Sequence, residues 1–573
     1  MSSNVRPATN VGAGTLREPD EQEFTINEGW DFFQKYMPDD SVINSKPFEI
    51  FSSDLQGGRT FRIVIPKYPG QFLNPSTLRL NGKCKVIYFD KNGQQAATLP
   101  VNQEAYRDPA LKHKIVPRLM ADTIDTVVAD PTTALKAGPG EELTKHNCFP
   151  VVYKDGENNA DKVHYIKLVD SHIDMPAKSW PEVVPVNLMC QALWKDIDIQ
   201  LNEQKVTNNA NLSYAHKAYL ETILTYGEEA LNTHMKSEMW MPDDSNEIAD
   251  ICKAEYQKTP ENQRDRPSDR DYHLTMGFYN KCYAYTARNQ TFSWSMMMHT
   301  ELNSIHTFLP DSIRYEFNLT RHEPQFFLRT PLGVDLKGGR YDVEIQDLSI
   351  SGEFMIPSKP VLDQLSSFMN KHDPVLRTNR TEILTTQIGK DLSYYEFRSI
   401  FPGNVLPDQI FVCLVNQAAL QGDLTRDPFY FHHFGAQSVQ MTVNNNNLPV
   451  NPYQIDWGNN DYARVYRALF ENTAIKTNNA GLFITPHRFK WGSTIYAWDL
   501  NHDRCAGAHS NHSTMYGQAN LRLQFKEALG EQVGVIVAGV FRDYLVFDQW
   551  RKPKVVNSHG IMELLAGGTM DHS

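Results

Sequence analysis

The sequence predicts an all-β-dominated fold: two tandem jelly-roll β-sandwiches, a double jelly roll, with short helices and long loop insertions. With 573 residues the chain is longer than one ordinary hydrophobic core can organise, so several domains are expected. Aromatic residues make up 11% of the chain, and Pro, Gly and Asn are abundant, which is typical of β-sandwiches with long loops. One strand–turn–helix unit also occurs twice, which indicates two related domains.

The second copy of this unit is the clearer one. Val439, Met441 and Val443 alternate with polar residues, which is the pattern of a half-buried strand. A polar, turn-forming stretch rich in Asn and Pro follows at 444–452. Apolar residues then recur at helical spacing over 462–470, which predicts a helix with one apolar face.

The first copy has the same order of elements. Ile197, Ile199 and Leu201 alternate with polar residues, the stretch 202–211 is polar, and a helix is predicted to begin at Tyr214. The spacings differ by a residue or two between the copies, so the order of structural elements is repeated and the sequence itself is not. Sandwiches bury alternate side chains of each strand, and each half supplies roughly the eight strands of a jelly roll.

The predicted domain boundaries follow the strand signals along the chain. In order, the segments are an N-terminal arm at 1–45, the first jelly roll at 46–356 with insertions near 91–181 and 240–290, a linker at 357–374, the second jelly roll at 375–550, and a C-terminal tail at 551–573. The first insertion loses the strand rhythm and is rich in Pro, Asp, Lys and Gly. It is either a large loop between strands or a small separate subdomain.

Individual strands are predicted from alternation and from turn residues. Strand signals begin at Pro47, and Asn81-Gly82 predicts a hairpin turn. Residues 313–319 and 521–525 alternate strictly, so their apolar side chains, Phe525 among them, are predicted to face a core. The continuous apolar run Val535–Val537 predicts a strand buried on both faces.

Composition restricts the classes of function. The formal net charge of −12 argues against nonspecific wrapping of nucleic acid, which needs Lys and Arg to displace counterions, although a local basic patch stays open. The 7 cysteines are scattered without CxxC pairs, which favours a reducing compartment over a disulfide framework. The first residues lack the apolar core of a signal peptide, and no run approaches the ~18 apolar residues of a membrane span. We therefore expect a soluble, intracellularly made protein with no transmembrane segment and no specific nucleic-acid binding.

The motifs that place a phosphate, a metal or a nucleophile are missing from the sequence: there is no P-loop, GxGxxG, HExxH or GxSxG. One cluster of residues has the side chains and the spacing of possible zinc ligands, although a polar loop is the simpler interpretation. The cluster consists of His502, Cys505, His509 and His512. The pair His432-His433 lies beside aromatic residues and is predicted to be structural. No enzyme activity, catalytic residue or cofactor is predicted.

A series of stretches in the second half follows a distinctive order. They are Phe411–Leu420, Arg426–His432, the strand around Val439 leading to Tyr462–Phe470, Thr494–Leu500, Gly517–Phe525 and Val533–Asp548. These look like the strands and the short helix of the double jelly-roll major capsid proteins of Polinton/Maverick elements and adintoviruses, which the chain resembles over roughly Tyr341 to Asp548. The match is weaker over Lys195–Leu224 and Ile313–Leu328, and the two insertions match nothing in that family.

The resemblance implies a trimeric capsomer, because two sandwiches per chain and three chains per ring give six similar blocks around a threefold axis. It implies a major capsid protein of an icosahedral double-stranded DNA virus or Polinton-like element. The expected location is the virion capsid, after synthesis in the cytoplasm or nucleus of the host cell. The implied partners are the other copies of the homotrimer, neighbouring capsomers, a penton or minor capsid protein, and a maturation protease.

The tail carries a candidate processing site. From Val555 the chain is predicted to leave the sheet, and the stretch from Leu565 to Thr569 resembles the cleavage pattern of adenovirus-like maturation proteases, which Polinton-type elements also encode. This makes Gly567 and Gly568 the candidate processing residues. A flexible tail, or a short helix packed on a neighbouring subunit, explains the same residues, and these interpretations stay open.

Two other functions also stay open. One is a carbohydrate-binding β-sandwich protein, which a secretion signal or a repeated aromatic platform would favour, and the sequence has neither. The other is a cellular scaffold derived from a capsid gene. Electron microscopy distinguishes a capsid protein from a carbohydrate-binding protein, because hexagonal trimers or shells indicate the former and dispersed monomers indicate the latter.

Overall fold

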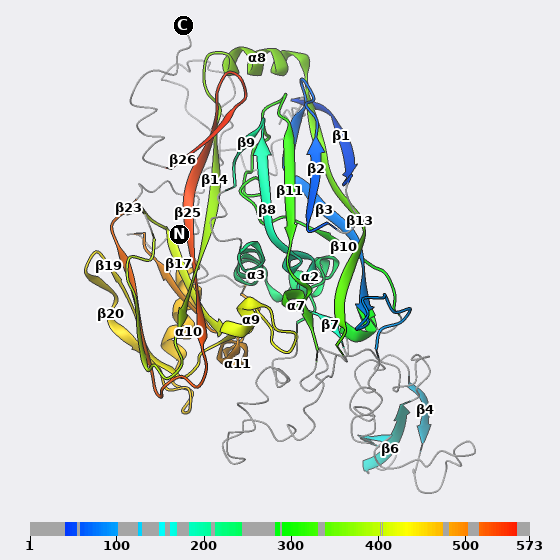
Figure 1. The fold of residues 1–573 in the computed structure, drawn as a ribbon, viewed down its shortest axis with the longest axis vertical. Helices are drawn as coiled ribbons and strands as arrows, with labels where there is room; N and C mark the ends of the chain where they lie inside the picture. Colours follow the sequence, from blue (N-terminus) through cyan, green and yellow to red (C-terminus); the bar gives the residue numbers. More distant parts are fainter. Residues whose placement is uncertain are drawn as a thin grey trace, which may run out of the picture.

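Two β-sandwiches lie side by side, with many strands running along the long axis of the molecule (Figure 1). The computed structural model describes residues 41–53, 58–100, 183–207, 213–242, 281–286, 289–330, 338–401, 403, 405–473, 481–501 and 515–557, together with the backbone of three strands between 124 and 168. Within these residues strands dominate and the helices are short.

The first sandwich is built from eight main strands in two four-stranded sheets. In chain order they are β1 (Val42–Phe51), β2 (Thr60–Ile65), β3 (Phe72–Phe89), β8 (Trp194–Leu201), β9 (Gln204–Lys205), β10 (Phe292–Met296), β11 (Tyr315–Arg321) and β13 (Arg340–Pro357). One sheet has the order β1-β13-β3-β10 and the other β2-β11-β8-β9. Counted along the chain, one sheet consists of the first, eighth, third and sixth strands. It faces the sheet of the second, seventh, fourth and fifth strands, and this arrangement is a jelly roll.

The second sandwich repeats this order strand for strand. Its main strands are β14 (Val375–Ile388), β15 (Tyr394–Phe397), β17 (Gln409–Asn416), β19 (Ala436–Val443), β20 (Asn446–Gln454), β22 (Ile495–Asp499), β24 (Ala519–Phe525) and β25 (Val533–Phe547). The sheets are β14-β25-β17-β22 and β15-β24-β19-β20. The predicted double jelly roll is therefore confirmed from the topology of the chain itself.

Short elements complete the described chain. The strands are β4 (Ile124–Val128), β5 (Cys148–Lys154), β6 (Asp161–Leu168), β7 (Val184–Pro185), β12 (Leu328–Arg329), β16 (Val405–Leu406), β18 (Phe431–His432), β21 (Trp491–Gly492), β23 (Met515–Tyr516) and β26 (Pro553–Asn557). The helices are α2 (Met189–Ala192), α3 (Tyr214–Thr225), α4 (Glu228–Asn232), α7 (Pro324–Phe327), α8 (Lys359–Met369), α9 (Gln417–Gln421), α10 (Ala463–Asn472) and α11 (Pro486–Lys490), with a 3₁₀ helix η3 (His234–Glu238) and a π-helix η6 (Cys282–Thr286). β4, β6 and β5 form a three-stranded sheet inside the first insertion.

The repeated strand–turn–helix unit is confirmed, with one correction in each copy. Helices α3 and α10 both lie between the fifth and the sixth strand of their jelly roll, as the repeated order of elements in the sequence predicts. The stretch 444–452, predicted to be a turn, instead contains most of strand β20, which pairs with β19. This strand lies at the edge of its sheet, where proline is tolerated because the missing N–H faces no partner strand. The polar stretch 202–211 likewise contains the short strand β9.

The predicted faces of the core strands are confirmed. Along β11, Tyr315, Phe317 and Leu319 are buried and alternate with partly exposed residues. Along β24, Leu521, Leu523 and Phe525 are buried and alternate with exposed residues. The run from Val533 to Gly539 in β25 is buried throughout, because this strand lies between β14 and β17 in its sheet.

The predicted hairpin at Asn81-Gly82 is wrong. Strand β3 continues through both residues and pairs with β13 on one side and β10 on the other. Gly82 is needed for packing, because a Cβ at this position would overlap the indole ring of Trp294 on β10. Glycine in a strand can mark the close approach of a neighbouring group, as it does here, and this signal has the same letters as a turn signal.

The predicted exit from the sheet at Val555 is also wrong. Strand β26 runs to Asn557 and pairs with β25, so that Val555 lies opposite Leu545. At the other end of the first jelly roll, β1 begins at Val42, five residues before the predicted first strand signal. Strand β1 lies at a sheet edge and is largely exposed, so its polar sequence does not show the alternation of a half-buried strand.

Candidate functional site

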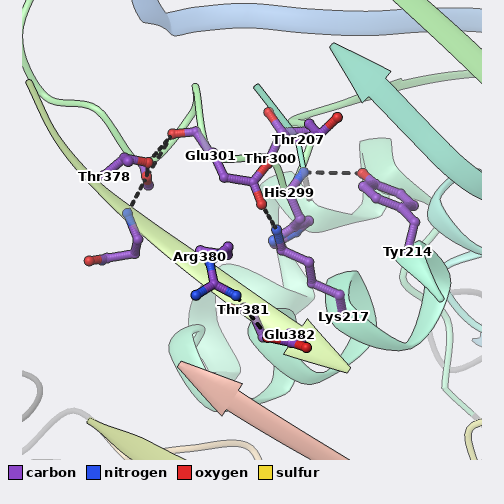
Figure 2. A network of polar contacts seen from close by, with 12 residues as sticks. Thr207, Tyr214, Lys217, His299, Thr300, Glu301, Thr378, Arg380, Thr381 and Glu382 are labelled. Atoms are coloured by element: carbon purple, nitrogen blue, oxygen red, sulfur yellow. Dashed lines mark hydrogen bonds and ion pairs between the residues drawn. The ribbon is translucent and has the colours of Figure 1, made fainter. Parts of the chain in front are cut away.

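The candidate site is the seam between the two jelly rolls, where helix α3 of the first packs beside strand β14 of the second (Figure 1). Strand β8 turns through β9 into α3, which places one polar edge of the helix against the second sandwich. The loop at 297–305, which follows β10, lies against the same edge. Figure 2 shows the polar side chains that meet there.

A buried ion pair of the first jelly roll lies beside the seam and joins α3 to the 297–305 loop. The Lys217 Nζ atom on α3 lies 3.1 Å from Oε1 of Glu301, and both side chains are 5% exposed. Burial by itself lowers the pKa of Lys217, but the carboxylates of Glu301 and Glu221 outweigh it, so the pKa is raised. The amine is therefore held protonated, which suits an ion pair and not a nucleophile.

A second chain of contacts crosses directly from one jelly roll to the other. Oε2 of Glu221 lies 2.8 Å from Nδ1 of His299, and its Oε1 accepts a hydrogen bond of 2.7 Å from Thr381 on β14. Burial raises the pKa of Glu221, but Lys217 and the hydrogen bond with His299 outweigh it, so the pKa is lowered. The carboxylate thus stays ionised and fixes α3 to β14.

The 297–305 loop makes a second set of contacts that crosses between the jelly rolls. The Thr378 hydroxyl on β14 donates to the backbone carbonyl of Glu301 at 2.7 Å. The Ser304 hydroxyl lies 2.9 Å from the same threonine hydroxyl and accepts from the backbone N–H of Asn379 at 3.0 Å. Backbone and side-chain groups of both jelly rolls therefore satisfy each other across the seam, which fixes their relative orientation.

An aromatic cluster extends the seam below α3. The Tyr219 ring stacks on Phe429 of the second jelly roll, with centroids 4.4 Å apart and planes inclined by 10°. His216, one turn earlier on α3, packs edge-on against both Phe429 and Phe326. The backbone N–H of Thr330 donates to the carbonyl of Leu424 at 2.6 Å, which adds a main-chain contact between the jelly rolls.

Histidines buried without charge lie at this seam and in the second jelly roll. Burial lowers the pKa of His216 to about 4, against the opposing hydrogen bond with the Pro428 backbone. His322 is partly buried, and its burial, helped by His216 and Lys195 nearby, lowers its pKa to about 3. In the second jelly roll, burial lowers the pKa of His432 to about 4. All three rings are therefore neutral in the folded chain at neutral pH.

Acid is expected to destabilise the protein through these rings. An unfolded histidine has a pKa near ~6.5, so below this pH the unfolded chain binds protons that the folded chain refuses. Stability is then lost progressively from about pH 6.5 to about pH 4, by at most about 1.4 kcal/mol per pH unit for each ring. The lowered pKa of Glu221 acts in a different window, because its contribution is lost only below about pH 4.3. Thermal unfolding across this pH range measures the loss.

The matched variants for this measurement are His216→Phe and His234→Phe. The first removes a buried titrating ring and should flatten the dependence of the melting temperature on pH. The second changes an exposed histidine and should leave the dependence as it is. A wild-type melting temperature that stays constant between about pH 6.5 and about pH 4.5 contradicts the prediction.

The remaining site predictions have separate outcomes. His432 and His433 are buried, their rings lie 4.3 Å apart, and His433 stacks on Trp457, an arrangement that agrees with the predicted structural role. Met296 and Met298 are fully buried in the core. The zinc candidates His502, Cys505, His509 and His512 lie outside the described residues, as do the candidate processing residues Gly567 and Gly568. Within the described part of the chain, no group of three or more His, Cys, Asp or Glu is placed to hold a metal ion.

The sequence interpretation did not find the seam. Lys217 and Glu301 are 84 residues apart, and nothing in their local patterns marks them as partners. A weak signal was present in α3, where Lys217 and Glu221 share a helix face with apolar neighbours that pack into the core. A charged pair on a buried helix needs a partner, so this helix face could have been predicted to contact a second domain.

Strand order, repeated helix position and buried seam together define a double jelly-roll protein. The whole chain is similar to a chain in the 3.5 Å cryo-EM structure of the Sputnik virophage, with 10% identity and a TM-score of 0.49 over 98% of this chain and 96% of that chain. It is similar to the mavirus major capsid protein, with 9% identity and a TM-score of 0.43 over 95% and 97%. It is also similar to the faustovirus major capsid protein, with 8% identity and a TM-score of 0.44 over 91% of this chain and 92% of that chain. Because the TM-scores are below 0.5, the fold assignment rests on the strand order of the chain itself.

Sequence comparison adds one curated relative. An uncharacterized protein of Caenorhabditis elegans is 23% identical over 300 residues, and the match covers 50% of this chain and 61% of that protein. The chain thus spans less than two thirds of the length of this relative. No protein-family model matches the sequence. In the part of the chain that the structure describes, no helix has the length and apolar character to cross a membrane.

Proposed function

We propose that the protein is a major capsid protein whose trimers form pseudo-hexameric capsomers of an icosahedral double-stranded DNA virus or Polinton-like element. The observation that carries the proposal is the duplication: the same strand order occurs twice in one chain, and a buried polar seam holds the two copies together. Three such chains present six similar sandwiches around a threefold axis.

The rigid seam supports this function physically. A shell subunit must present both sandwiches at a fixed angle, because an error at one contact is repeated at every symmetry-related contact. The hydrogen bond between Glu221 and Thr381 ties α3 to β14, and the hydrogen bonds of Glu301 and Ser304 tie the 297–305 loop to the same strand. A flexible tether between two carbohydrate-binding modules would not need these buried contacts.

Exposed apolar side chains supply surfaces for contacts between copies. On the second jelly roll, Leu392, Tyr394, Val450 and Tyr516 are exposed in the single chain. Exposed apolar groups of this kind are what a subunit interface covers. The proposed partners are therefore other copies of the chain, neighbouring capsomers, a penton or minor capsid protein and a maturation protease, and the proposed location is the virion capsid.

The trimer is the first test. The purified protein is expected to scatter light with three times the mass of the chain at micromolar concentration, because obligate interfaces bury on the order of 2,000 Å² or more and do not dissociate there. Electron microscopy should then show hexagonal trimers or shells. A monomer in light scattering together with dispersed single particles contradicts the proposal and favours a binding module or a scaffold.

A further inference from the structure

One end of the molecule, formed around helix α8, differs from the rest of the surface. Strand pairing places several chain turns there: the start of β1 lies opposite Pro357, the start of β14 opposite Val546, and the start of β26 opposite Phe547. Figure 1 shows α8 across this end, with the β25–β26 turn beside it. The first insertion leaves β3 at the other end, roughly 55 Å away along an 18-residue strand.

Exposed lysines gather at the α8 end. They are Lys46 on β1, Lys67 between β2 and β3, Lys359 and Lys371 at the two ends of α8, and Lys552 and Lys554 at the start of β26. We call this set the lysine end. The described carboxylates of the same end are Asp363 on α8, Asp373 after it, Asp548 in the β25–β26 turn, Glu353 opposite Pro47, Asp311, which lies 3.6 Å from Arg551, and Glu203, which lies 3.8 Å from Arg314. With Arg314 and Arg551 counted beside the six lysines, the described residues of this end carry more positive than negative groups, in a chain whose net charge is −12.

The negative charge elsewhere on the chain does not cancel this local field. Salt at physiological strength screens charges beyond a Debye length of about 8 Å, which is much shorter than the molecule. A ligand at the lysine end therefore meets mainly the groups located there.

The β25–β26 turn presents an aromatic side chain among these lysines. Trp550 is 70% exposed, although exposing an indole ring gives up the free energy of burying it. The turn is held firmly: one oxygen of Asp548 accepts from the backbone N–H groups of Trp550 and Lys552, both at 2.8 Å. The Asn202 side chain of the first jelly roll donates to the carbonyl of Arg551 at 2.8 Å, which ties the turn to the first jelly roll.

A second exposed aromatic lies on α8 itself. Phe368 is 60% exposed, and of the eleven residues of this helix only Met369 is buried. Lys552 is two residues from Trp550, and Lys371 is three residues from Phe368. Exposed aromatic rings close to lysines form a surface that attracts phosphates and gives bases or sugars an apolar platform.

We propose that the lysine end, together with Trp550 and Phe368, binds nucleic acid without sequence preference. The lysines contact backbone phosphates, and the aromatic rings contact exposed bases or sugars. The inference deepens the proposed function, on which it rests, because a capsid subunit encloses nucleic acid on one side of the shell. It assigns that side to the α8 end and leaves the insertion end to the opposite side.

The experiment measures binding of the full-length protein to a fluorescently labelled single-stranded DNA of random sequence, whose bases are exposed, over a series of salt concentrations. Binding through six phosphate contacts falls about three hundredfold between about 50 and about 200 mM salt. The double variant Lys552→Gln/Lys554→Gln should reduce the slope of log Kobs against log salt by about 1.4, since each lost phosphate contact of a single strand removes about 0.7. Trp550→Ala should weaken binding and leave this slope unchanged, because it removes stacking and no charge.

The control is Lys91→Gln/Lys390→Gln, which removes two exposed lysines located away from α8 and should leave binding unchanged. The inference is overturned if the Lys552/Lys554 variant binds like the wild type, if the control loses as much, or if the protein binds vesicles of anionic phospholipid and not DNA. If the Trp550→Ala variant no longer scatters light as a trimer, the indole ring belongs to a contact between subunits, and its proposed contact with nucleic acid is overturned. A monomer that still binds DNA through these lysines supports the inference while contradicting the capsomer.

Discussion

Phe525→Asp is expected to unfold the second jelly roll. The Phe525 side chain on β24 is 2% exposed and belongs to the core between the two sheets. Its backbone is fixed on both sides, since it lies opposite Ala436 of β19 and its N–H donates to the carbonyl of Ser393 at 2.8 Å. The one cation of this strand, Arg522, lies on the opposite, exposed face and pairs with Glu396, so a carboxylate held at 525 would be buried without a partner from its strand, which costs several kcal/mol.

Two variants of the same strand test the physical reason. Gln524→Asp adds the same carboxylate one residue earlier, on the exposed face of β24, and should change the melting temperature little. Phe525→Leu keeps an apolar side chain and should cost about 1–3 kcal/mol through the smaller volume. The measurement is thermal unfolding followed by circular dichroism. Wild-type melting of Phe525→Asp would show that this residue does not face the core.

Strand faces were predictable because they depend only on local sequence. Alternation along 313–319 and 521–525 fixed which side chains are buried, since a shift of one residue would turn every apolar group outward. Helix α3 and helix α10 were predictable for the same reason, because a repeated apolar spacing of three and four residues marks one helix face. The duplication followed from comparing these local patterns with each other.

The errors lie where a residue's role depends on a distant neighbour. Gly82 looks like a turn residue in the sequence, and only the Trp294 ring on another strand makes it a strand residue. Strand β20 looks like a turn because its prolines and asparagines suit an exposed sheet edge as well as a loop. The end of β26 was missed because its partner strand β25 supplies the hydrogen bonds, and the five residues of β26 show little pattern of their own.

The seam could not be predicted because it is a property of how two folded units dock. Each jelly roll can be read from its own strands, but the angle between them is decided by pairs such as Glu221 with Thr381 and Tyr219 with Phe429. These residues are separated by 160 residues or more in the chain. The seam nevertheless determines whether the two jelly rolls keep a fixed orientation, and mutations at the seam measure this directly.

Lys217→Met is expected to loosen the seam and to lower the free energy of unfolding by about 3–5 kcal/mol, because it leaves Glu301 as an uncompensated buried carboxylate. The Oε2 atom of Glu301 already lacks a hydrogen-bond partner, so this side chain has no second contact to fall back on. The backbone of Glu301 accepts from Thr378, and its displacement would therefore disturb the contact with β14. Thermal unfolding measures the loss of stability, and limited proteolysis of the 297–305 loop measures the loosening.

A second ion pair in the same chain provides the control. The Arg467 and Glu471 pair on α10 has the same distance of 3.1 Å, but its side chains are 61% and 51% exposed. Arg467→Met should therefore cost only about 0.3–0.5 kcal/mol. The double variant Lys217→Met/Glu301→Met should recover much of the stability that Lys217→Met loses, because two apolar side chains of similar size leave no buried charge. Equal losses for Lys217→Met and Arg467→Met would show that the Lys217–Glu301 pair is solvated and does not support the loop that contacts β14.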